Sequence, residues 1–392
     1  LTASALVLLM TPGLAFFYGG LVRGKNVVST MMYSYVSMAV VSVMWVLWGY
    51  SLAFGAGGDF IGNLDFVGFK DVSASGEDGG ISPMLFAIFQ MMFAIITPAL
   101  ITGAFVERFK FTTYIVFLVV WVTLVYVPIT HWVWASDGWI AGLGALDFAG
   151  GIVVHASAGI AAIVVAKMIG TRRNIERGVE PHNVPYVLLG TGLLWFGWFG
   201  FNAGSGLLAD STAVSAFLVT NTSAAVAGLV WMVLDYQSTG RVSAVGFATG
   251  VIAGLASITP AAGFVGPMGA LAIGTIGSIA AYTTVKLMAK TSIDDALEVF
   301  AVHGVGGLWG TIATGIFATG GVGLIDGDSD LLWANFRAAV AVVIYSGIAS
   351  FIILKILDLI PGLGLRTSEE DEDRGLDIAL HGERGYVADG AD

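Results

Sequence analysis

Cysteine is missing from this sequence, and charged residues are scarce. None of the 392 residues is Cys, and Asp, Glu, Lys and Arg together make up 11% of the chain. Without a thiol, the chain cannot form a disulfide, a thiolate metal site or a cysteine nucleophile. Soluble globular proteins carry roughly 25% charged residues, so such a low share excludes an ordinary soluble domain. The formal net charge of −11 argues against nucleic acid as a partner.

Long apolar runs take the place of the missing charge. Hydrophobic residues make up 56% of the chain. Apolar segments of about 20 residues recur along almost its whole length, as membrane-spanning helices require. A transmembrane β-barrel would show short alternating segments instead. The 54 glycines fit helices that approach each other closely in lipid. We therefore expect an all-α integral membrane protein.

The apolar runs predict eleven transmembrane helices. The expected helices cover residues 2–22, 27–54, 83–106, 112–134, 148–168, 184–205, 212–234, 242–259, 266–288, 296–318 and 331–360. They divide the chain into a first five-helix half (1–168), a basic cytoplasmic loop (169–183), a second five-helix half (184–318), the eleventh helix (331–360) and a cytoplasmic tail (361–392).

Lysine and arginine are concentrated in alternate loops. They occupy positions 23, 25, 108, 110, 167 to 177, 241, 286 and 290 and the tail, whereas the opposite loops hold Lys70. The positive-inside rule then predicts a protein of the cytoplasmic membrane with its N-terminus outside and its tail in the cytoplasm. Because five helices precede the second half, that half enters the membrane inverted. Such inverted repeats are typical of secondary transporters, whose site lies near the midplane.

Two matched strings place a carboxylate and a histidine eight residues apart. Asp147 precedes His155, Asp295 precedes His303, and each histidine begins the pattern His-x-x-x-Gly after a valine. Eight helical residues span roughly 12 Å, so each acid can lie at a membrane surface while its histidine lies near mid-depth. Ionisable groups inside a membrane mark functional sites. The repeat therefore points to a transport path.

Of the five histidines, only these two fall in the middle of an expected helix; His131 lies near an interface, His182 in the basic loop and His381 in the tail. A histidine removed from water is expected to be neutral, with one nitrogen that donates and one that accepts. Two in contact could form a proton relay, or each could simply bond a backbone carbonyl. No metal is expected, because zinc needs three or four convergent ligands. We expect no enzyme, since no nucleophile and base are paired.

Other polar and aromatic residues allow two interpretations each. Asp147 could attract a cation at the outer surface, or it could be the N-cap of the helix that follows. We expect it to organise the outer mouth and the nearby backbone. Trp134 fits the aromatic belt of a membrane protein, or it offers a π face to a cation. Ser205 ends the string 198–205 with a hydroxyl that can accept a hydrogen bond from an ammonium-like donor. Phe93 and Phe201 could be ordinary core residues.

The sequence resembles the ammonium transporter family, the Amt/Mep/Rh superfamily, in its microbial Amt type and over essentially its whole length. The matching strings are residues 12–20, 103–108, 147–151 with His155, 197–205, 302–307 and, in the tail, 364–366, 375–377 and 381–383. The resemblance implies a homotrimer with one narrow, mostly hydrophobic pore through each subunit. It also implies a PII-type signalling protein as a partner of the cytoplasmic face. We expect no cofactor.

The resemblance assigns roles to individual residues. It implies an ammonium recruitment site formed by Phe93, Trp134 and Ser205, with a phenyl gate of Phe93 and Phe201 beneath it. It also implies that Trp198 is a pore-lining tryptophan, that Asp147 is the entrance acid, and that His155 and His303 are the twin histidines of the pore.

The expected function is ammonium transport across the cytoplasmic membrane. Ammonium resembles potassium in charge and size, but it can give up a proton. We expect ammonium to be recruited at the outer aromatic site and deprotonated, and ammonia to pass along the histidines of a dry pore that penalises ions. The alternatives are an ammonium sensor and a neutral ammonia gas channel with the same fold.

Overall fold

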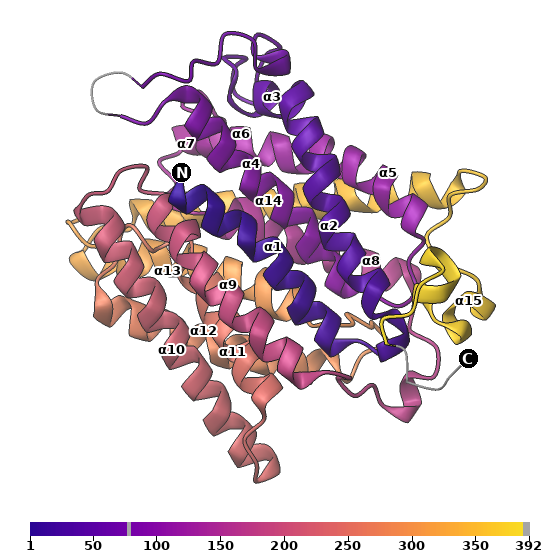
Figure 1. The fold of residues 1–392 in the computed structure, drawn as a ribbon. Coiled ribbons are helices and arrows are strands. Elements are labelled where there is room, and N and C mark those ends of the chain that lie inside the picture. Colours follow the sequence, from indigo (N-terminus) through magenta and orange to yellow (C-terminus); the bar gives the residue numbers. More distant parts are fainter. Residues whose placement is uncertain (77–79, 387–392) are drawn as a thin grey trace.

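The computed structural model describes residues 1–76 and 80–386. In these ranges the regular structure is helical, apart from one isolated bridge between Phe109 and Arg366 (Figure 1). The α-helices are α1 (Thr2–Leu21), α2 (Val27–Met44), α3 (Tyr50–Phe54), α4 (Pro83–Ile101), α5 (Phe111–Trp121), α6 (Val127–Trp134), α7 (Trp139–Gly142), α8 (Ser157–Ile169), α9 (Val184–Gly204), α10 (Ser211–Thr239), α11 (Ala244–Ile258), α12 (Pro267–Met288), α13 (Gly306–Phe317), α14 (Asp330–Leu359) and α15 (Glu369–Arg374).

Several transmembrane helices continue through short π-helical segments. These segments are Trp45–Gly49, which joins α2 to α3, Val122–Tyr126, which joins α5 to α6, Gly151–Ala156, which leads into α8, and Phe300–Val305, which leads into α13. A fifth, Asp377–His381, lies in the tail. π-helical turns are rare and are frequently found at functional sites.

The prediction of an all-helical protein with many membrane spans is confirmed. Within the described ranges, ten helical stretches are long and apolar enough to cross a membrane. The apolar helix α11 is shorter, at 15 residues, and nearly all of its residues are buried. It coincides with the expected helix at 242–259, so every expected span has a helical counterpart.

The starts of several helices follow directly from the sequence. The side-chain oxygens of Ser82, Asn183, Asp210 and Ser243 each accept a hydrogen bond from a backbone N–H in the first turn of α4, α9, α10 and α11. Serine, asparagine and aspartate are favoured at this capping position. In α4 the cap is followed by Pro83, whose missing N–H costs nothing in the first turn.

The two halves meet closely where α1 runs alongside α9, the first helix of the second half (Figure 1). A Cβ atom added at Gly190 would lie 2.3 Å from the backbone nitrogen of Phe17, and one added at Gly197 would lie 2.3 Å from Cγ of Met10. No side chain fits at these positions. Glycine therefore permits the close packing of helices that the composition suggested.

The tail folds back over one end of the bundle, which we call the tail face. The backbone N–H of Lys110 donates to the carbonyl oxygen of Leu365 at 2.9 Å, and Lys25 Nζ donates to two carbonyl oxygens of α15 at 2.6 and 2.8 Å. Helix α2 leads from there to the opposite end, which we call the loop face. The loop face carries residues 55–76 and 80–82 and helix α7 (Figure 1).

Candidate functional site

His155 and His303 meet in the interior of the bundle. Each lies in a π-helical segment, His155 in Gly151–Ala156 and His303 in Phe300–Val305. Their Nδ1 atoms are 3.2 Å apart, and their rings are nearly parallel, with centroids 5.2 Å apart at 21°. The two side chains are almost wholly buried, at 1% and 3% exposed. The matched spacing in the sequence thus corresponds to a matched pair in space.

The glycine that follows each histidine by four residues lies against the other half. A Cβ atom at Gly159 would lie 2.2 Å from the backbone of Gly304 and 3.1 Å from the carbonyl carbon of His303. A Cβ atom at Gly307 would lie 2.8 Å from Cβ of His155. The repeated pattern His-x-x-x-Gly therefore places each glycine where it lets the histidine segment of the other half approach. This crossing brings the two imidazoles into contact.

Two matched carboxylates hold the starts of the histidine segments. The carboxylate of Asp147 accepts four hydrogen bonds of 2.6 to 3.1 Å from the backbone N–H groups of residues 150 to 153. Asp295 Oδ2 accepts one of 2.7 Å from the backbone N–H of Phe300. An acid in this position satisfies N–H groups that have no partner within the helix. Of the roles considered for Asp147, the structure therefore shows the capping of a helix start.

Aromatic rings form a continuous column from Trp134 to the histidines. Trp134 stands edge-on to Phe93, with centroids 5.8 Å apart, and Phe93 packs on Phe201 at 4.3 Å. Phe201 in turn stacks on His155 at 5.9 Å and 24°. Trp198 stacks on the same imidazole at 5.3 Å. Phe93 and Phe201 are each 1% exposed, so their rings close the column between the loop face and the histidines.

Two polar contacts fix the end of this column at the loop face. The indole Nε1 of Trp134 donates to the backbone carbonyl oxygen of Asp147 at 2.8 Å, which ties the tryptophan to the segment that carries His155. Ser205 lies one helical turn beyond Phe201, and its hydroxyl donates to the carbonyl oxygen of Phe201 at 2.8 Å. A hydroxyl that donates in this way still has lone pairs to accept a hydrogen bond.

His303 borders two cavities. The smaller one also touches His155, Trp198 and Phe201, and it offers about 10 Å³ to the centre of a water-sized molecule. That is about the space for one water molecule. The larger one, of about 180 Å³, reaches toward the tail face and is also lined by Arg172 and Glu298. Glu298 has a left-handed backbone with φ of 63°, an uncommon conformation for a residue with a side chain.

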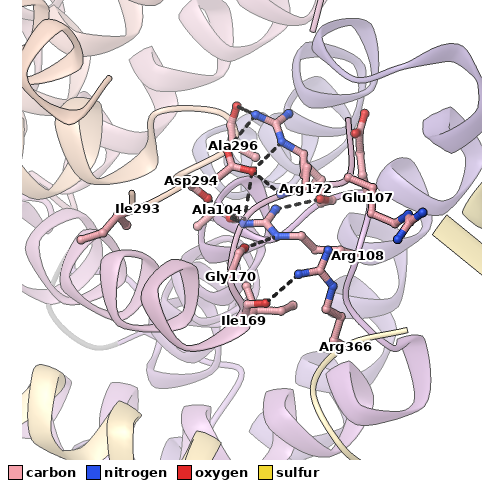
Figure 2. Close-up of polar contacts among 12 residues, drawn as sticks. Ala104, Glu107, Arg108, Ile169, Gly170, Arg172, Ile293, Asp294, Ala296 and Arg366 are labelled. Carbon is pink, nitrogen blue, oxygen red and sulfur yellow. Dashed lines mark hydrogen bonds and ion pairs between the residues drawn. The ribbon is translucent and has the colours of Figure 1, made fainter. Parts of the chain in front are cut away.

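A buried ionic cluster at the tail face supports the segment that carries His303 (Figure 2). Arg172 forms two hydrogen bonds to the carboxylate of Asp294, at 2.8 and 2.9 Å. Arg108 donates to the carbonyl oxygens of Asp294 and Gly170, at 2.6 and 2.9 Å. Arg366 from the tail donates to the carbonyl oxygen of Ile169 at 3.1 Å. Asp294 directly precedes the capping Asp295, so this cluster joins the tail to that cap.

Sequence reasoning did not identify this ionic cluster. In the sequence, Arg108 and Arg366 belong to the family strings 103–108 and 364–366, and Arg172 is a basic residue of a cytoplasmic loop, but nothing indicates that the three lie together. Among the described residues, no group of three or more His, Cys, Asp and Glu side chains could hold a metal ion.

Comparison with known proteins gives one consistent result. The model of the ammonium transporter family matches residues 1–386. The ammonium transporter of Bacillus subtilis is 48% identical over 390 residues, which cover 97% of this chain and 96% of the relative. The crystal structure of Mep2 from Candida albicans superposes with a TM-score of 0.89 at 37% identity, over 94% of this chain and 85% of that one. A solved structure of a sensor Amt protein gives a TM-score of 0.89 at 32% identity, over 97% and 96%.

Proposed function

This chain belongs to the ammonium transporter family and transports ammonium, and we propose that its pathway runs from Trp134 past Phe93 and Phe201 to the pair of His155 and His303. The protein is a transporter and not an enzyme. The observation that carries the proposal is the 3.2 Å contact between two imidazoles contributed by matched segments. A cavity with room for about one water-sized molecule lies beside them.

Recruitment begins at the loop face. The ring faces of Trp134 and Phe93 attract a cation that has lost part of its water, and the hydroxyl of Ser205 can accept one of the four N–H bonds of ammonium. Potassium would meet the same rings but has no hydrogen to donate. These three residues therefore recruit ammonium, and Asp147 acts as the entrance acid by holding the indole of Trp134 and the neighbouring backbone in place.

The phenyl gate selects ammonium over ions that cannot lose their charge. Phe93 and Phe201 close the column with apolar rings, and an ion that stays charged in such an environment costs several kcal/mol. Ammonium avoids this cost when it gives up its proton: neutral ammonia moves into the small cavity, and the proton passes separately along the contacting imidazoles, so one positive charge crosses for each ammonium taken up. Trp198 lines that cavity. The imidazole pair offers ammonia a donor and an acceptor, and each ring can take up a proton at one nitrogen and release one from the other.

The arrangement in the membrane follows from charge. We place the loop face outside and the tail face in the cytoplasm, because basic residues accumulate at the tail face. In this arrangement the eleven helices form two inverted five-helix halves and a final helix in the cytoplasmic membrane. We also propose that the chain assembles as a homotrimer, and that a PII-type signalling protein docks on the loops and tail of the cytoplasmic face.

A sensor is the second candidate function. It is favoured by the likeness to a sensor Amt protein over nearly the whole chain. A sensor would bind ammonium at the same column but carry little flux. A neutral gas channel, the third alternative, would carry flux without moving charge. Ammonium-dependent currents on solid-supported membranes identify the proposed transporter, because it alone gives sustained charge movement. Uptake into proteoliposomes then separates the gas channel, which carries flux, from the sensor, which carries little.

The proposed pathway is tested by uptake into proteoliposomes. The double variant His155→Leu/His303→Leu keeps a filled, apolar interior but removes both imidazoles. We expect ammonium uptake to fall to the level of empty liposomes. His182→Leu, at the tail face and outside the column, is the matched control and should keep uptake close to that of the parent. Unchanged uptake in the double variant would rule out the pathway.

A further inference from the structure

His131 is a fully buried histidine outside the column of the transport path. It lies near the end of α6 and has 0% exposed surface. Its Nδ1 is 2.9 Å from the carbonyl oxygen of Ala53, and its Nε2 is 2.6 Å from the carbonyl oxygen of Gly58. Both distances are those of hydrogen bonds. Ala53 belongs to the last turn of α3, and Gly58 belongs to the loop that follows α3 at the loop face.

A carbonyl oxygen can only accept a hydrogen bond. A neutral imidazole has one donor and one acceptor, so it can satisfy only one of these two carbonyls, whereas an imidazolium donates from both nitrogens. The surroundings also supply a counter-charge, because Asp137 Oδ1 lies 3.7 Å from Nε2. Asp137 is bound in turn to the same loop, since its Oδ2 accepts from the backbone N–H of Gly58 at 3.2 Å.

Two further contacts fasten the loop that His131 holds, one from α6 and one from the first residue of α7. The indole Nε1 of Trp132 donates to the carbonyl oxygen of Phe60 at 2.7 Å, and the backbone N–H of Trp139 donates to the carbonyl oxygen of Asp59 at 3.1 Å. Residues 58–60 thus lie against the end of α6. Trp134, which follows His131 by three residues, packs on Phe93 from that same helix end.

We propose that His131 is a positioning residue held as an imidazolium, which ties residues 53 to 60 to the end of α6 and so fixes Trp134 in the recruitment site. The part of this proposal that concerns Trp134 rests on the proposed function. The charge of His131 does not, because it is argued from the two carbonyl partners and the neighbouring carboxylate of Asp137.

His182 provides an internal comparison. Its Nδ1 is 2.8 Å from the carbonyl oxygen of Val22, and its Nε2 is 3.1 Å from the hydroxyl of Tyr386. A hydroxyl can donate as well as accept. A neutral His182 therefore satisfies both contacts, and the same argument that requires a charge at His131 requires none here.

The charge is tested by solid-state NMR on the full chain, labelled with ¹⁵N-histidine and reconstituted in liposomes. At about pH 8, where an ordinary histidine is neutral, we expect one histidine with protons on both ring nitrogens. That signal should be absent from His131→Gln and present in His182→Gln. A spectrum with neutral rings only, or an imidazolium signal that persists in His131→Gln, would overturn the proposal.

The positioning role is tested by transport kinetics on the same variants. His131→Gln should raise the KM for ammonium by about three- to tenfold, the effect of roughly one lost buried hydrogen bond, while the maximal rate changes little. An unchanged KM would overturn the positioning role. Trp134→Ala is measured beside it. If Trp134→Ala leaves KM unchanged, the recruitment site itself is refuted, whereas the NMR result on His131 stands independently.

Discussion

The α-carbon of Gly307 faces the side chain of His155, so closely that a Cβ atom on the glycine would lie 2.8 Å from Cβ of the histidine and 2.6 Å from the carbonyl oxygen of Gly151. This contact joins the two halves of the chain at the depth of the imidazole pair. It explains why a glycine follows each pore histidine by four residues, and it makes the pair sensitive to a single methyl group.

Gly307→Ala should therefore separate the two histidine segments. Overpacking of a close helix contact costs about 1–3 kcal/mol, and we expect a lower melting temperature together with strongly reduced ammonium uptake. Gly347→Ala is the matched control, because among the described residues a Cβ atom there would meet only Ile160 Cγ2, at 3.4 Å. Equal uptake and stability in the two variants would contradict this role of Gly307.

Asp147 should matter through the backbone that it holds. Asp147→Ala leaves four N–H groups without their acceptor, and the loss of a helix cap costs roughly 0.5–2 kcal/mol. We expect a lower melting temperature and a weaker recruitment site. Asp147→Asn keeps one carbonyl oxygen and should lie between Asp147→Ala and the parent. If Asp147→Asn is as damaging as Asp147→Ala, the negative charge itself, and not the cap, is the required feature.

The docked tail depends on Gly375. This residue has φ of 100°, and a Cβ atom would lie 2.7 Å from Cβ and 2.8 Å from the carbonyl oxygen of Lys25. Gly375→Ala should loosen the tail and speed its removal by limited proteolysis. Gly382→Ala is the control for backbone strain alone, since φ is 70° there but no atom of the described residues lies within 4 Å of the added Cβ. Equal proteolysis rates in both variants would mean that the contact with Lys25 is unimportant.

The ionic cluster at the tail face should stabilise the protein in a pH-dependent way. Burial alone would raise the pKa of Asp294, but the hydrogen bonds and charge of Arg172 hold the pKa of this carboxyl below its usual value. A carboxyl with a depressed pKa in the folded state contributes stability above its unfolded pKa, about 3.9, and loses that contribution as the pH falls through the folded value.

Asp294→Asn should therefore lower the melting temperature at neutral pH, since breaking a buried ion pair costs about 3–5 kcal/mol. The difference from the parent should shrink as the pH falls below about 4. Glu369→Gln is the control, because its pair with Arg173 lies at an exposed site, where ion pairs contribute little to stability. A difference between Asp294→Asn and the parent that is independent of pH would contradict the assignment.

Much of the fold could be predicted from the sequence, because long apolar runs leave few choices for a chain in lipid. The pairing of His155 with His303 could also be predicted, since two matched strings in two halves imply one meeting point. The π-helical form of their segments could not, because the same apolar residues fit an α-helix equally well. Their matched capping by Asp147 and Asp295 was visible only as a spacing of eight residues.

Long-range polar contacts were the least predictable part. Arg108 and Arg172 were visible as basic residues near helix ends, but their shared partner Asp294 lies 186 and 122 residues away. His131 was assigned to an interface from its place in an apolar segment. Nothing local reveals that its ring nitrogens face two carbonyls of a loop more than 70 residues earlier.

The most direct test of the central claim compares currents on solid-supported membranes for the parent and the His155→Leu/His303→Leu variant, with ammonium and with potassium. If the contacting imidazoles are the pathway, the parent gives a current with ammonium and none with potassium, and the double variant gives neither. An ammonium current of parental size in the double variant, with potassium still excluded, would contradict the account.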